Sequence, residues 1–118
     1  MKDSIFITQG KGPFGNIKNA FSSLDLKSLK NKSVLVKPNI GRMAKPGSGI
    51  NTHPEAIAGV LEVLKDCGCS KIAIGESPIL GVKTMDAFRM SGVDEVAKRY
   101  GCGLLDMDAK KPVNKNPF

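Results

Sequence analysis

The chain has 118 residues, of which 41% are hydrophobic and 25% charged, so it is long enough to bury a core of its own. No apolar run reaches the roughly 18 residues of a membrane span, and the N-terminus lacks the apolar core of a signal peptide, so we expect a cytoplasmic protein with no membrane partner. The net charge is +7, but five Phe, one Tyr and no Trp offer few rings for stacking on bases, which argues against nucleic acid as a partner.

The N-terminal third contains two predicted strands. Residues 4–8 (SIFIT) are apolar and β-prone, which predicts a first strand. Residues 16–29 are ambiguous, because a partial helical spacing of apolar residues is interrupted by serines. Residues 34–36 (VLV) form a short apolar run bounded by turn residues, which is typical of a strand buried on both faces.

The middle of the chain predicts a helix over residues 53–66. The run Thr52-His53-Pro54-Glu55 has the form of a capping box, in which Thr52 caps the helix and the Glu55 side chain reaches back to the Thr52 N–H. Apolar residues then follow at helical spacing, and Gly68 ends the helix. These residues are Ile57, Val60, Leu61 and Leu64.

The remaining elements alternate between strand and helix. Residues 71–77 (KIAIGES) and 104–108 (LLDMD) predict two more strands, with short helices over Thr84–Ser91 and Val93–Tyr100 between them. Crossovers of this length join parallel strands. The fold class is therefore α/β, a layered domain with a mainly parallel sheet and a β-α-β-α-β core. We expect residues 1–118 to form a single domain that ends in a polar tail, residues 109–118.

The polar residues that follow the strands predict a ligand site. Ligands of open parallel sheets bind beyond the carboxyl ends of the strands, and all the excess positive charge lies in the first fifty residues. Much of that charge, between residues 18 and 32, is typical of a solvated face. Loop glycines accompany the charge after residue 36, which favours a small anion as partner. The candidate ligand-binding residues are Lys37, Asn39, Gly47, Gly49, Thr52 and Ser77.

Glu76 and Lys37 are the candidate catalytic residues. A carboxylate after the apolar run of a strand, one strand spacing from Lys37, predicts either a structural ion pair or a base or metal ligand. Asp108 and His53 are weaker candidates, with Glu76, for a metal site. At most one of Asp106 and Asp108 is expected to face the site.

The three cysteines, Cys67, Cys69 and Cys102, are expected to be packing residues. They cannot all pair within one chain, and the single residue between Cys67 and Cys69 does not match a Cys-x-x-Cys redox or zinc motif. Three thiolates fall short of the four that hold an iron–sulfur cluster, so none is expected in this chain.

The order of these motifs resembles a known family. The run VLVKPN, a loop, THPE, an amphipathic helix and KIAIGES, over roughly residues 34–108, is similar to the opening of the domain-of-unknown-function 362 family. Many members are longer and carry ferredoxin-like cysteines, which this chain lacks. The resemblance implies that the chain is the N-terminal portion of a longer domain, or a short relative, and its exposed apolar surface would then drive self-association.

Three functions remain open on the sequence alone. The first is an enzyme-like domain that binds a small anionic ligand or a metal at the rim of the sheet. The second is a structural or interaction fragment without activity. The third is a weak nucleic-acid-binding module, which the sequence pI near 9.5 suggests and the scarcity of aromatic residues opposes.

Overall fold

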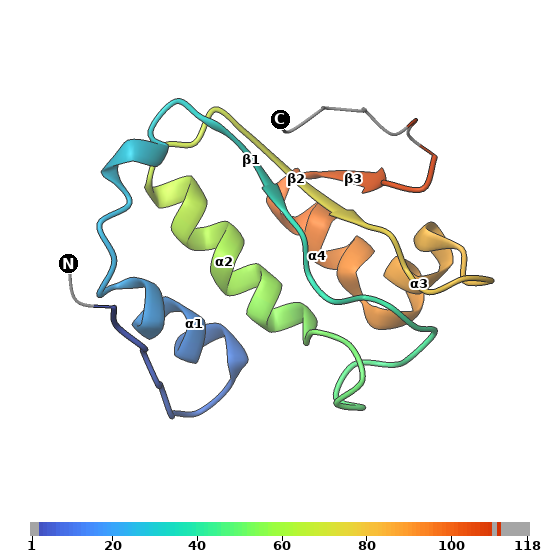
Figure 1. Cartoon of the computed structure of the whole chain (residues 1–118). Helices are drawn as coiled ribbons and strands as arrows, with labels where there is room; N and C mark the ends of the chain where they lie inside the picture. Colours follow the sequence, from blue (N-terminus) through green and yellow to red (C-terminus); the bar gives the residue numbers. More distant parts are fainter. Residues whose placement is uncertain (1–2, 110, 112–118) are drawn as a thin grey trace.

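The computed structural model describes residues 3–109 and 111. Within them the chain forms a three-stranded, all-parallel sheet of order β1-β2-β3, which confirms the α/β prediction. Figure 1 shows the elements in chain order. They are α1 (Pro13–Phe21), the 3-10 turn η1 (Lys27–Leu29), β1 (Ser33–Val36), α2 (Pro54–Asp66), β2 (Lys71–Glu76), α3 (Thr84–Ser91), α4 (Val93–Tyr100) and β3 (Gly103–Asp106).

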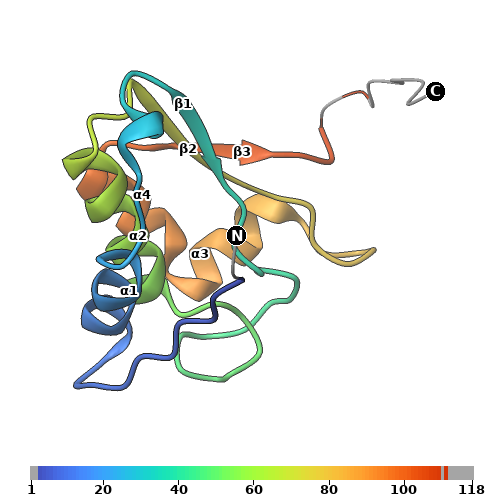
Figure 2. The same cartoon turned by 60° about the vertical axis from the view of Figure 1, so that its left-hand side comes forward.

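The helices lie on one face of the sheet (Figure 2). The core forms between that face and α2, α3 and α4, and residues from all these elements contribute to it. In α2 the predicted apolar stripe is confirmed, because Ile57, Leu61 and Leu64 are buried and Val60 is half-buried. The fully buried Phe88 of α3 and Ile74 of β2 belong to the same cluster.

The prediction that β1 is buried on both faces is wrong. Burial alternates along the strand, and the side chain of Leu35 is 47% exposed. The reason is the one-sided arrangement of helices, which leaves the opposite face of the sheet without a covering layer among the described residues. On that face Leu35 and Met107 lie over Gly75, since a Cβ built on Gly75 would come within 3.0 Å of Leu35 and 3.3 Å of Met107.

The predicted strand over residues 4–8 is also wrong for this structure. No strand is assigned there, and Ile5 and Ile7 are almost fully exposed. The ambiguous region, residues 16–29, holds most of α1, which begins at Pro13, and all of η1. The predicted helices Thr84–Ser91 and Val93–Tyr100 are confirmed with the predicted bounds.

The predicted capping box does not form. The N-cap residue of α2 is His53, whose Nδ1 accepts a hydrogen bond from the Glu55 N–H at 3.1 Å. Pro54 explains the shift, because a residue that precedes proline is driven into the extended region, and His53 has φ −65° and ψ 133°. The helix therefore begins one residue later, and the Glu55 carboxylate pairs with Arg99 at 2.9 Å.

In the part of the chain that the structure describes, no helix is long and apolar enough to cross a membrane. Most of the predicted polar tail, residues 109–118, lies outside the described residues.

Candidate functional site at the carboxyl ends of the strands

Glu76, the last residue of β2, has a buried carboxylate that accepts three hydrogen bonds. The Lys37 ammonium lies 2.8 Å from Oε1, and the Ser77 N–H donates to the same oxygen at 2.8 Å. The Ile40 N–H donates to Oε2 at 2.9 Å. Only 2% of Glu76 is exposed. The predicted ion pair with Lys37 is therefore present, and Glu76 ties the end of β1 and the start of the following loop to β2.

These contacts determine the charge state of Glu76. Burial alone raises the pKa of a carboxyl group, because it disfavours the charged form. The hydrogen bonds from Lys37, Ile40 and Ser77 outweigh that effect and lower the pKa of Glu76 below its ordinary value of 4.5. Glu76 is thus an anion at neutral pH and a weak proton acceptor.

The loop between β1 and α2, residues 37–53, is closed at its base by hydrogen bonds across it. The Asn39 N–H donates to Thr52 Oγ1 at 3.0 Å, and the Thr52 N–H donates to the Asn39 carbonyl at 2.8 Å. One step outward, the Asn51 side chain accepts from the Arg42 N–H and donates to the Arg42 carbonyl. Thr52 therefore holds the loop and does not cap the helix.

The outer part of this loop carries positive charge and glycines. Arg42 and Lys45 are exposed and form no ion pair with any residue that the structure describes. Gly47 and Gly49 have φ of 80° and 76°, a left-handed conformation that favours glycine. The loop tip approaches the α3–α4 junction, since a Cβ built on Gly92 would lie 3.5 Å from Pro46.

The start of α2 offers few free donors. Pro54 has no N–H, the Glu55 N–H donates to His53 Nδ1, and the Ala56 and Ile57 N–H groups donate to the His53 carbonyl. The first-turn groups that often bind anions at a helix N-terminus are therefore already occupied. His53 acts here as a helix cap.

The end of β3 lies beside Ser77. The Ser77 hydroxyl donates to Asp108, and the Thr84 hydroxyl donates to Asp106 at 2.8 Å. The Asp108 N–H also donates to the Asp106 carboxylate. The expectation that at most one of the two aspartates faces the site is therefore wrong: both lie at this rim, because residues two apart along a strand point to the same side. Together they make this side of the rim negative.

The structure brings most of the predicted site residues to one rim. Glu76 contacts both Lys37 and Ser77, and Asp108 joins them through Ser77. Asn39 pairs with Thr52 at the base of the loop. Gly47 and Gly49 lie further out on the loop. Within residues 3–109 and 111, no three His, Cys, Asp or Glu side chains gather as a metal ion would require, so Glu76, Asp108 and His53 are not brought together as a metal site.

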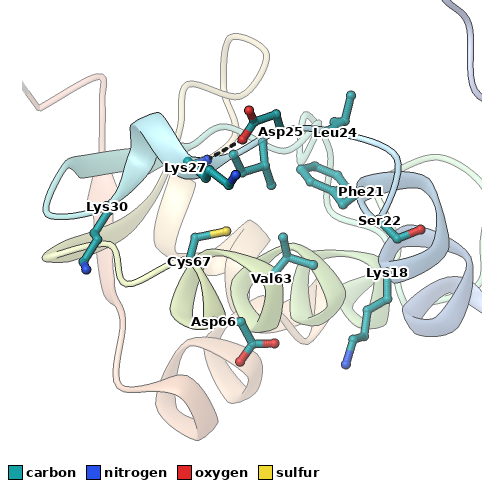
Figure 3. A pocket seen from close by; sticks show the side chains of 11 residues that line it. Lys18, Phe21, Ser22, Leu24, Asp25, Lys27, Lys30, Val63, Asp66 and Cys67 are labelled. Carbon is teal, nitrogen blue, oxygen red and sulfur yellow. Dashed lines mark hydrogen bonds between the residues drawn. The ribbon is translucent and has the colours of Figure 1, made fainter.

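A cavity of about 550 Å³ at the other end of α2 was not predicted from the sequence (Figure 3). It lies between α1, the turn around η1 and the last turns of α2, with apolar walls from Phe21, Leu26 and Val63. Cys67 and three lysines also line it. The only signal in the sequence was the partial helical spacing in residues 16–29, which does not reveal that this segment packs on α2.

The cysteines of the described chain are free and half-buried. Burial raises the pKa of the Cys102 thiol, although the nearby Lys65 acts in the opposite direction. A raised pKa keeps the thiol protonated at neutral pH, and a protonated thiol is a poor nucleophile and metal ligand. Cys102 also packs against the core, which agrees with the predicted packing role.

The parallel sheet, its one-sided helices and the polar rim define the class of protein, an α/β domain with a candidate site beyond the carboxyl ends of its strands. The chain belongs to the family described as "Domain of unknown function (DUF362)", whose family model matches residues 34–117. The matched segment begins at the second residue of β1 and contains the loop after it, β2 and β3, whereas α1 precedes it. Neither a curated protein nor a solved structure matches the chain.

Proposed function

We propose that the loop after β1 binds a small anionic molecule, such as a metabolite with a phosphate group. The observation that carries this proposal is the exposed pair Arg42 and Lys45, for which the described residues supply no carboxylate within ion-pair distance. An arginine presents a planar fork of donors that suits phosphate oxygens. The loop carrying this pair is held in one shape by the Asn39–Thr52 and Arg42–Asn51 hydrogen bonds.

Neighbouring groups define where such an anion would sit. Lys37 keeps 55% of its side chain exposed although its charge is compensated by Glu76. The Asn39 side chain is also exposed, and glycines at 47 and 49 allow a ligand to approach the backbone closely. On the other side of Ser77, Asp108 would repel an anion. The ligand would therefore lie on the Lys37–Asn39 side of the rim.

In this proposal Glu76 supports the site and does not react. Its oxygens accept from Lys37, Ile40 and Ser77, and its lowered pKa makes it a poor base. Its role would be to orient Lys37 and the first residues of the loop. The proposed function is accordingly ligand binding, without a catalytic step.

Titration with inorganic phosphate tests the proposal. Two-dimensional NMR of the ¹⁵N-labelled chain at constant ionic strength should show saturable shifts of the Arg42, Gly47 and Gly49 amides. Because the site is open to water, we expect a dissociation constant on the order of 1 mM, about −4 kcal/mol. The double variant Arg42→Gln/Lys45→Gln should weaken binding about tenfold or more, since charge-assisted hydrogen bonds are lost.

The matched control removes the same type of charge elsewhere. Lys71→Gln changes an exposed lysine at the start of β2, the opposite end of a parallel sheet. It should leave the phosphate affinity unchanged. Shifts that never saturate, or that weaken equally in Lys71→Gln, would show only a general attraction of a basic protein for anions and would refute a site at this loop.

A further inference from the structure

Helix α1 continues the row of helices beneath the sheet. It packs against α2, and α2 packs against α4 (Figures 1 and 2). Helices α1 and α2 run in the same direction. Phe14 of α1 lies against Gly59, whose added Cβ would be 2.9 Å from the Phe14 carbonyl oxygen, and further along Phe21 and Val63 line the same cavity.

The position of α1 is the position of a crossover helix. The helices α2 and α4 each precede the next strand of the order β1-β2-β3, and α1 precedes β1 in the same way. Crossovers between parallel strands are right-handed in nearly all proteins. A helix in the position of α1, beside α2 and on the β1 side of it, therefore normally follows a strand that pairs with the outer edge of β1. Residues 4–8 are apolar and β-prone enough to form such a strand, and the connection 9–12 has the length of an ordinary strand-to-helix loop, about 2–6 residues.

That strand is not in the sheet of this structure. Ile5 and Ile7 are 91% and 90% exposed, and the Thr8 hydroxyl donates to the Asn16 carbonyl of α1 at 3.0 Å. In both views this dark-blue segment lies near α1 at the bottom of the molecule, whereas β1 lies at the top (Figures 1 and 2). Within the described residues the outer edge of β1 has no neighbouring strand. An open edge with unpaired backbone groups is a template for another strand.

We propose that two copies of the chain exchange these segments, so that residues 4–8 of each copy pair in parallel with the outer edge of β1 in the other. The Thr8 contact ties the segment to α1, away from β1 of its own copy, and Ile5 and Ile7 stay exposed for another. Pairing would satisfy the backbone groups of both edges and would bury apolar side chains that water now surrounds. The exchange is reciprocal, so it closes as a symmetric dimer. This inference is independent of the anion site.

Sedimentation equilibrium of the full chain tests the exchange. We expect a concentration-dependent dimer, and the double variant Ile5→Lys/Ile7→Lys should raise its dissociation constant about tenfold or more, because lysines cannot be buried in the paired strand. Both side chains are almost fully exposed, so the variant should keep its circular dichroism spectrum. The matched control is Ile79→Lys/Leu80→Lys, which places two lysines at other exposed apolar positions and should leave the dimer intact.

Hydrogen exchange identifies which edge is used. In the dimer, the amides of residues 5–7 and of β1 should gain protection as the protein concentration rises. A monomer with protected residues 5–7 would mean that the segment closes on its own β1, and it would overturn the exchange. A monomer with unprotected residues 5–7 would overturn it as well. So would a dimer that the Ile79 and Leu80 control weakens as much as the Ile5 and Ile7 variant does.

Discussion

At the scale of single residues, Glu76 joins three parts of the rim. Its carboxylate receives the Lys37 ammonium and the backbone N–H groups of Ile40 and Ser77, in a buried position. We expect Glu76→Gln to lower the free energy of unfolding by about 3 kcal/mol, because it removes the charge and places an amide N–H opposite other donors. Urea denaturation measures this loss.

Lys37→Gln is the control for this variant. More than half of the Lys37 side chain is exposed, so its contribution is screened by water, and the two backbone donors to Glu76 remain. Its loss should be about 1 kcal/mol. Equal losses in the two variants would contradict a dominant role for the backbone contacts of Glu76.

The pH dependence of stability follows from the same carboxylate. The pKa of Glu76 is lowered in the folded state, so the unfolded chain binds its proton first as the pH falls. The stabilisation from ionised Glu76 is therefore complete above the ordinary value of 4.5 and is lost as the pH falls through the lower folded value. The difference in unfolding free energy between the wild type and Glu76→Gln should narrow below about pH 4.5, and a constant difference down to pH 3 would contradict this.

At the scale of elements, the contact between α1 and α2 depends on a glycine. A Cβ on Gly59 would lie 2.9 Å from the Phe14 carbonyl oxygen and 3.1 Å from Ile17. Backbone atoms cannot move aside as a flexible side chain can. We expect Gly59→Ala to lower stability by about 1 kcal/mol, because the overpacking cost of roughly 1–3 kcal/mol exceeds the gain in helix propensity.

Gly15 provides the opposite case. It lies in α1 with nothing within 4 Å of an added Cβ, and its φ is not positive. Gly15→Ala should therefore raise the free energy of unfolding by about 0.5 kcal/mol through helix propensity. Thermal denaturation of both variants gives the comparison. If both raise stability, α1 does not pack on α2 as closely as the structure has it.

At the scale of the whole molecule, stability should be greatest around β2. This strand pairs with β1 on one side and β3 on the other, and its Ile74 is fully buried. Strands β1 and β3 each pair on one side only within the described residues. At low protein concentration, native-state hydrogen exchange should therefore be slowest at Ile72 and Ile74, because their exposure requires the largest opening. Slower exchange in β3 than in β2 would contradict this order.

The sequence by itself determined the elements whose signals are local. Gly92 separates α3 from α4, and it adopts the left-handed φ of 79° that a glycine allows at a helix end. The apolar spacing of α2 and the apolar runs of β1, β2 and β3 likewise depend on residues close in the chain. The parallel order followed from crossover length. The Lys37–Glu76 pair could be foreseen because neighbouring parallel strands end at the same rim.

Only the tertiary structure decided the features that depend on distant residues. Whether residues 4–8 pair depends on whether the rest of the fold places them beside a free edge, and a strand has no internal hydrogen bonds to hold it elsewhere. The exposure of Leu35 depends on which face the helices cover. Thr52 could serve as a helix cap or as an acceptor for Asn39, and Pro54 together with the closed loop favoured the second. Local patterns specify what a segment can form, whereas burial and hydrogen-bond partners elsewhere in the fold select among those possibilities.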